Sequence, residues 1–164
     1  MVESVEGILL DVDYVSIDGR SVIRLFLKTK KGIEIFEDPQ FRPYFYVTSS
    51  NVKEVRKRLM EAEFEEGSKI AAVSSVKKVN AENVLKLEFQ NVGDLTNTRQ
   101  GIEGIPGVDQ KFEYDIPFAK RYLLDHELLP MGAVKLQVKG KNVKSAGAIA
   151  SAEEKFNTAA FDLE

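Results

Sequence analysis

The spacing of apolar residues near the N-terminus predicts antiparallel strands. In GILLDVDY at 7–14 and SVIRLFLK at 21–28, apolar and polar side chains alternate, and the Asp18–Gly19 pair between them is typical of a tight turn. A second turn at 30–32 leads to a short apolar segment at 33–36. These segments together predict a β-hairpin that continues into a third strand.

The following stretch, up to Tyr114, switches between strand and helix patterns. A strand is predicted at 44–48. A helix is predicted after the N-cap candidates 49–51, because Val52, Val55, Leu59 and Ala62 follow at helical spacing. The remaining predicted elements are strands at 70–79 and 84–90, a weaker helix at 94–102 and a strand at 108–114. This β-α-β-β-α-β order is that of a split βαβ unit. The predicted fold class is therefore α+β, with an N-terminal β-hairpin or meander and a ferredoxin-like, RNA-recognition-like sheet of four antiparallel strands with two helices.

The C-terminal part carries weaker signals. A short helix begins at Pro117, and residues 132–157 are rich in Gly, Ala, Ser and Lys, which predicts a hairpin or a linker. Residues 158–164 read as the start of a strand on which Asp162 and Glu164 share one face. Paired carboxylates suit a Mg²⁺ or Mn²⁺ site for phosphodiester cleavage, and the alternative is a solvated acidic segment.

Composition and charge exclude several function classes. The chain of 164 residues has no cysteine and a single histidine, His126, which excludes disulfide scaffolds, thiolate chemistry and multi-histidine metal sites. The net charge of −3 argues against nonspecific duplex binding by the whole surface, although a local pocket that reads one base remains compatible with it. We find no apolar run near the roughly 20 residues of a membrane span and no signal peptide, so a cytoplasmic protein without a membrane partner is expected.

Two groups of residues on the early strands each have two interpretations. Asp11 and Asp13 are either metal ligands or polar positions on a strand with one apolar face. The aromatic residues Tyr44, Phe45 and Tyr46 are either a nucleic-acid stacking platform or core residues, and Phe45 should face opposite its two neighbours. From the sequence alone, polar strand positions are preferred for the two aspartates, and a core role is preferred for at least Phe45.

The first predicted helix is locally basic. Lys53, Arg56, Lys57 and Arg58 can follow a phosphate backbone or can form a solvated helix face. Acidic residues follow at once, between Glu61 and Glu66. That neighbourhood favours the solvated face.

Four stretches are more specific than these general patterns. They are Leu10–Tyr14 (LDVDY) with Val22–Phe26 (VIRLF), Phe41–Tyr46 (FRPYFY), Phe112–Leu123 (FEYDIPFAKRYL) and Ala160–Glu164 (AFDLE). In this order and at these separations they resemble the N-terminal domain of archaeal family B DNA polymerases, from about Ile8 to Pro130 and again from Ala160. The resemblance implies a template-reading domain at 1–130, and a linker with the first strand of a truncated 3′–5′ exonuclease domain at 131–164.

The resemblance also implies a function and its residues. The intact protein is expected to be a DNA-directed DNA polymerase with 3′–5′ proofreading, and this chain alone is expected to be inactive. The front domain should bind single-stranded template and recognise uracil ahead of the polymerase site. The residues implied for the uracil pocket are Tyr14, Pro43, Tyr44, Val84, Phe118 and Arg121, and those implied for the exonuclease metal site are Asp162 and Glu164.

The implied cofactor is Mg²⁺ or Mn²⁺ in the intact enzyme, with none in this chain alone. The implied partners are template DNA and the remaining domains of the same polymerase. The alternative is a free-standing ferredoxin-like module that binds a protein partner or a small effector.

The residue types of the implied pocket suit a flipped base. A base needs flat apolar walls for stacking, which Tyr14, Pro43 and Phe118 can supply, and fixed polar groups at its edge. Arg121 can hold a neighbouring phosphate or brace the pocket. Because favourable contact discriminates one methyl group by only about 1–3 kcal/mol, rejection of thymine should depend on a rigid wall.

Overall fold

The computed structural model describes residues 1–78 and 81–152. These residues form two compact units. One contains Met1–Asp13, Arg24–Asp38 and the residues from Leu123 onward, and the other contains Tyr14–Ile23 and Pro39–Tyr122. The predicted strand with Asp162 and Glu164 lies outside the described residues.

A closed barrel of five strands forms around the N-terminal strands. The strands are β1 (Glu3–Ile17), β2 (Arg20–Thr29), β3 (Gly32–Asp38), β8 (Ala133–Lys139) and β9 (Asn142–Ala148), in the order β1-β2-β3-β9-β8. Strand β8 pairs antiparallel with both β1 and β9, and β3 pairs parallel with β9. The three predicted N-terminal strands are confirmed, and the barrel accounts for their long apolar faces.

Residues 133–148 form a hairpin of the two strands β8 and β9, which is one of the two structures predicted for the stretch 132–157. In β8, Val134, Leu136 and Val138 are buried, whereas Lys135 and Lys139 are exposed and Gln137 is half-buried, so the segment has a period of two residues. Gly140, with φ +62°, allows the tight turn into β9. The high content of lysine and small residues concealed this alternation, because every second position faces solvent.

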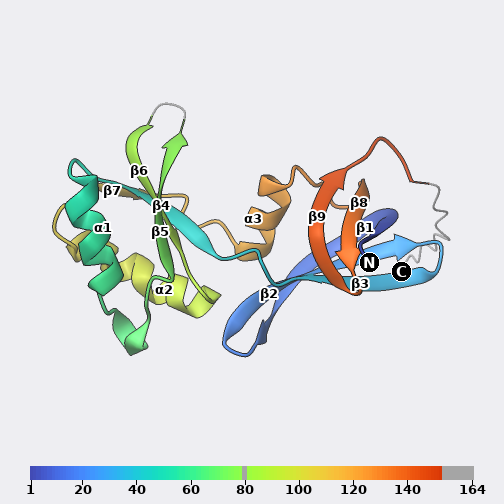
Figure 1. Ribbon diagram of the computed structural model, residues 1–164, viewed down its shortest axis with the longest axis horizontal. Coiled ribbons are helices and arrows are strands. Elements are labelled where there is room, and N and C mark those ends of the chain that lie inside the picture. Colours follow the sequence, from blue (N-terminus) through green and yellow to red (C-terminus); the bar gives the residue numbers. More distant parts are fainter. Residues whose placement is uncertain (79–80, 153–164) are drawn as a thin grey trace, which may run out of the picture. The chain divides into compact units, whose positions relative to one another are not determined.

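The second unit contains a four-stranded sheet with helices. In chain order, its elements are β4 (Tyr44–Thr48), α1 (Val52–Glu61), η1 (Glu65–Gly67), β5 (Ala72–Lys78), β6 (Ala81–Glu88), α2 (Val92–Gly101), η2 (Ile102–Gly104) and β7 (Gln110–Phe112). Helix α3 (Phe118–Asp125) follows, and its last residues belong to the first unit. The sheet order is β5-β6-β4-β7, and all three neighbouring pairs are antiparallel (Figure 1). The predicted α+β class and the order of strands and helices are confirmed.

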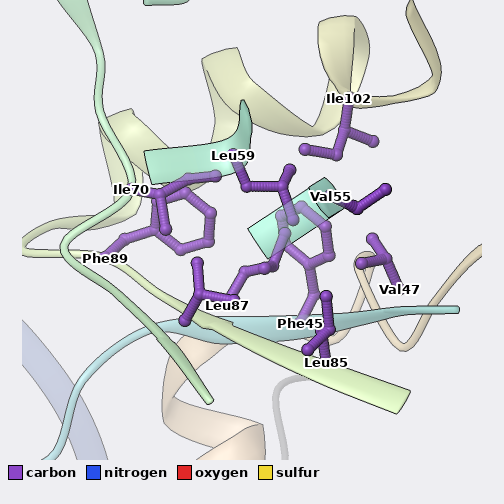
Figure 2. Packing of buried hydrophobic residues seen from close by; sticks show 10 residues of the cluster. Phe45, Val47, Val55, Leu59, Ile70, Leu85, Leu87, Phe89 and Ile102 are labelled. Atoms are coloured by element: carbon purple, nitrogen blue, oxygen red, sulfur yellow. The ribbon is translucent and has the colours of Figure 1, made fainter. Parts of the chain in front are cut away.

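Helices α1 and α2 pack on one face of this sheet through a hydrophobic core. Figure 2 shows Phe45 and Leu87 from the strands pointing toward Leu59 of α1, with Ile102 beyond the end of α2. Phe45 is fully buried and stacks on Phe89, with ring centroids 5.4 Å apart. Tyr44 and Tyr46 belong to a separate cluster with Val84, so the prediction that Phe45 faces opposite its two neighbours is confirmed.

The beginning of α2 is held in place by side chains and by the β1–β2 turn. Asn91 caps the helix by accepting a hydrogen bond from the Asp94 amide at 2.8 Å, and its own amide group donates to the Gly19 carbonyl at 3.1 Å. The Val92 amide donates to the Ser21 hydroxyl at 3.0 Å. These contacts fix the first turn of a helix that lines the site described below. Among the described residues, no helix is long and apolar enough to cross a membrane.

Candidate functional site

A cavity of about 180 Å³ lies within the second unit. Its walls come from the start of β4, from one side of α2, and from the loop that leads into α3. The lining residues are Pro43, Tyr44, Val92, Leu95, Thr96, Arg99, Tyr114, Asp115, Ile116, Pro117, Phe118 and Arg121. Aromatic and aliphatic side chains therefore enclose a space with two arginines at its boundary.

Four of the six residues implied for the uracil pocket line this cavity. They are Pro43, Tyr44, Phe118 and Arg121. Tyr14 does not line it, and its half-exposed ring instead packs edge-on against Phe118 with centroids 5.5 Å apart. Tyr14 therefore supports a wall of the cavity from outside.

Val84 is the position at which the structure departs from the implied site. Its side chain is only 1% exposed and packs in a cluster with Tyr44 and Tyr46, and it is not among the lining residues. The cause is its register in β6, where Val84 pairs with Thr48 at the far end of β4 from Tyr44. Val84 therefore lies outside the lining of this cavity.

Helix α2 and the loop before α3 supply the lining residues that the sequence analysis missed. Val92, Leu95, Thr96 and Arg99 follow one another at helical spacing on α2. Residues 114–117 belong to the FEYDIPFAKRYL stretch, which could have indicated them. No comparable sequence signal indicated the α2 residues, because their role depends on where the helix packs.

Arg121 is the most constrained charged group of the site. Its side chain is 6% exposed, and its Nη1 and Nη2 donate to the Glu113 carboxylate at 2.6 Å and to the Glu113 backbone carbonyl at 2.7 Å. The guanidinium carbon lies 4.6 Å from the centre of the Tyr44 ring. Within the described part of the chain, the buried Nε has no hydrogen-bond partner. A buried donor without a partner is unfavourable, and because this atom is fully enclosed, the guanidinium must shift before an acceptor on a ligand can reach it.

Glu113 holds Arg121 in this position. Its backbone has φ +57°, a conformation that non-glycine residues seldom adopt. Burial raises the pKa of the Glu113 carboxyl, but hydrogen bonds from Lys78 and Arg121 lower that pKa by more, so the net shift is downward. The carboxylate is therefore ionised at neutral pH and bridges two cations.

Three of the other polar groups singled out in the sequence, Asp13, Lys57 and Arg58, form ion pairs. Asp13 accepts two hydrogen bonds from Arg24, at 2.8 and 2.6 Å. On α1, Arg58 pairs with Glu54 and Lys57 lies 3.9 Å from Glu61, which agrees with a solvated helix face. No group of three or more potential metal ligands occurs within residues 1–78 and 81–152.

A larger cavity, of about 990 Å³, lies in the first unit. It is lined by both lysines and glutamates, which include the ion pairs Lys135–Glu6 and Lys141–Glu34. None of the residues implied for the uracil pocket contributes to it. The smaller cavity is therefore the candidate functional site.

Comparisons with known proteins identify relatives. No protein-family model matches the chain. A DNA polymerase of Pyrococcus glycovorans is 39% identical over 132 residues, which cover 75% of this chain and 16% of the relative. DNA polymerase 1 of Pyrococcus abyssi is 38% identical over 132 residues, which cover 75% of this chain and 17% of the relative.

The fold agrees with a solved structure of the same class. The family B DNA polymerase from the hyperthermophilic archaeon Pyrobaculum calidifontis matches 94% of this chain and 21% of its own with a TM-score of 0.74 and 22% identity, a likeness that concerns the fold. The chain spans about one sixth of the length of these two curated relatives. Over the matched residues, the chain belongs to the archaeal family B DNA polymerases.

Proposed function

We propose that this chain is the template-reading domain of a DNA polymerase and that its 180 Å³ cavity accepts a single base of the unpaired template. The size supports one ring rather than a larger ligand, because an engineered cavity of about 150 Å³ holds one benzene molecule. The walls also suit a base, since Pro43, Tyr44 and Phe118 present flat or rigid apolar surfaces.

The observation that carries the proposal is the unpaired Nε of Arg121. Arg121 lines the cavity, and a small shift of its guanidinium would let a base carbonyl or a flanking phosphate supply the acceptor that this buried atom lacks among the described residues. Glu113 and Tyr44 already hold the guanidinium beside the cavity, so only a local shift is needed when the ligand arrives.

Uracil is the proposed base. In this proposal, a wall formed by Pro43 and the first turn of α2 meets the additional methyl group of thymine. Attraction alone would distinguish the two bases by about 1–3 kcal/mol, and a rigid wall adds a steric penalty. Cytosine differs in its donors and acceptors, so a site that matches uracil would leave buried polar groups unpaired with cytosine.

The experiment is fluorescence anisotropy on labelled single strands that carry one uracil or one thymine, at fixed moderate salt. The wild-type chain should bind the uracil strand more tightly. Val92→Gln should abolish the preference because Val92 lines the cavity at the first turn of α2. Val52→Gln is the matched control, since Val52 begins α1 and does not line the cavity.

Two outcomes decide the proposal. Loss of the uracil preference in the Val92 variant but not in the Val52 variant supports a base pocket in this cavity. Equal binding of both strands by the wild-type chain contradicts uracil recognition by this chain.

For the intact protein, we infer a cytoplasmic DNA-directed DNA polymerase with 3′–5′ exonuclease activity, partnered by its own remaining domains and by template DNA. In that protein Asp162 and Glu164 would be exonuclease carboxylates that bind Mg²⁺ or Mn²⁺. The chain alone should show neither activity, and nucleotide incorporation or strand degradation by the purified chain would contradict this.

The sheet order β5-β6-β4-β7 with alternating helices supports a ferredoxin-like arrangement of the second unit.

A further inference from the structure

The face of the four-stranded sheet opposite the hydrophobic core carries a continuous row of aromatic rings. Phe41, Tyr44, Tyr46 and Phe112 follow one another with centroid separations of 6.3, 5.3 and 5.8 Å. We refer to these four residues as the aromatic row. Because Tyr44 also lines the cavity, the row begins at the candidate site and leads away from it across β4 to β7.

Two lysines lie on this row at fixed positions. The Lys86 ammonium is 4.0 Å from the centre of the Tyr44 ring, and the Lys78 ammonium is 3.9 Å from the centre of the Tyr46 ring. Each is also held by a carboxylate, Lys86 by Glu88 at 3.0 Å and Lys78 by Glu113 at 2.5 Å. These contacts remove much of the freedom that a lysine side chain normally has.

Both lysines keep donors for a further partner. An ammonium group has three N–H donors, and the carboxylate contact of each lysine uses one of them. Their side chains are 28% and 26% exposed, so an anion can reach them from solvent. The neighbouring carboxylates keep the net charge of this face low, which disfavours strong duplex binding.

We propose that Lys78 and Lys86 on the aromatic row bind the backbone phosphates of single-stranded DNA beside the nucleotide whose base enters the cavity. The inference rests on the proposed function, because the cavity defines where the strand begins. A cationic groove with aromatic side chains is the usual combination for single strands. Here Tyr44 and Tyr46 are buried, so the two lysines that lie over them make the contact with the strand. Continuity through Tyr44 and Arg121, which contact both the cavity and the row, favours this ligand over a protein partner.

The test compares charge-removing variants on the two sides of the sheet. Lys86→Met and Lys78→Met keep the apolar stem over the tyrosine ring and remove the charge, so packing is largely retained. Lys57→Met is the matched control because Lys57 is on α1, which packs on the opposite face, and its side chain is 76% exposed. Affinity for the uracil strand and for the thymine strand is measured by anisotropy across a series of salt concentrations.

The expected result is a smaller salt dependence. Each phosphate contact to a single strand contributes about 0.7 to the slope of log K against log salt. The double variant should therefore lose about 1.4 from the slope for both strands. Lys57→Met, which lies outside the cavity and the aromatic row, should leave both the slope and the ratio of uracil to thymine affinity unchanged.

A double variant with the same slope as Lys57→Met would overturn the inference, whereas equal binding of the uracil and thymine strands by the wild type would overturn only the proposed function. Absence of any single-strand binding would overturn both. Lys86→Arg provides a second check against simple destabilisation, because it keeps the charge and should restore the slope.

Discussion

The Glu113 carboxylate is the group whose removal tests the architecture of the site most directly. Glu113→Gln removes the negative charge and keeps the size and backbone of the residue. The unfavourable φ of +57° at residue 113 therefore affects the stability of the wild type and of the variant equally. The substituted amide side chain can still accept one hydrogen bond, and the backbone carbonyl of residue 113 can still accept from Arg121. The substitution therefore isolates the effect of charge.

The expected loss follows from the two bonds that the carboxylate accepts. A hydrogen bond to a charged group contributes about 1.5–3 kcal/mol and a neutral one about 0.5–1.5 kcal/mol. The bond to Arg121 should lose the full difference between a charged and a neutral hydrogen bond, because the Arg121 side chain is only 6% exposed. The bond to Lys78 should lose only part of that difference, because the Lys78 side chain is 28% exposed. We expect a loss of about 2 kcal/mol in the free energy of unfolding.

Urea denaturation at pH 7 measures this change. Glu103→Gln is the control because it makes the same substitution in an ion pair, Lys111–Glu103 at 3.3 Å, whose carboxylate is 63% exposed. It should cost no more than about 0.5 kcal/mol. If Glu113→Gln costs as little as Glu103→Gln, the buried Arg121 does not depend on this carboxylate and the reasoning is refuted.

The same carboxylate should make stability depend on pH in a defined direction. Burial raises the pKa of Glu113, but hydrogen bonds from Lys78 and Arg121 lower it by more, so the folded value lies below the ordinary 4.5. A lowered folded pKa contributes stability above the unfolded value, and the contribution is lost as pH falls through the folded value. The gap between wild type and Glu113→Gln should be constant from neutral pH to about pH 5 and should narrow below 4.5. A gap that widens on acidification would contradict this assignment.

Three further substitutions test the packing of the second unit by urea denaturation. Phe45→Ala should cost about 3–5 kcal/mol because the ring is fully buried, and a loss below about 1.5 kcal/mol would contradict its place in the core. Gly107→Ala should lower the free energy of unfolding by about 1–3 kcal/mol, because φ is +93° and the new Cβ would lie 2.5 Å from Val55 Cγ2. Gly104→Ala is its control and should cost less, because a Cβ at that position meets no atom within 4 Å. Asn91→Ala should cost about 1 kcal/mol through loss of the α2 cap, and a neutral result would contradict that role.

Local sequence pattern was a good guide wherever one side of a segment meets a core. The alternation in SVIRLFLK and the helical spacing of Val55 and Leu59 predicted β2 and α1, because a strand and a helix each bury side chains at a characteristic period. The opposite orientations of Phe45 and Tyr46 followed from the same rule. Four of the six implied pocket residues also meet at one cavity, and all four lie in the two short stretches FRPYFY and FEYDIPFAKRYL.

Tertiary structure decided what local pattern does not encode. Closure of the barrel by β8 depends on pairing between Val5 and Leu136, which are far apart in the chain, and a linker-like composition concealed it. The choice of Val92 over Val84 as a cavity residue depends on strand register and on where α2 packs. The unpaired Nε of Arg121 likewise exists only because Glu113 and Tyr44 converge on its guanidinium. The sequence by itself determined the elements and their buried faces, since these depend on neighbouring residues, whereas the site depends on contacts between distant segments that only the folded chain brings together.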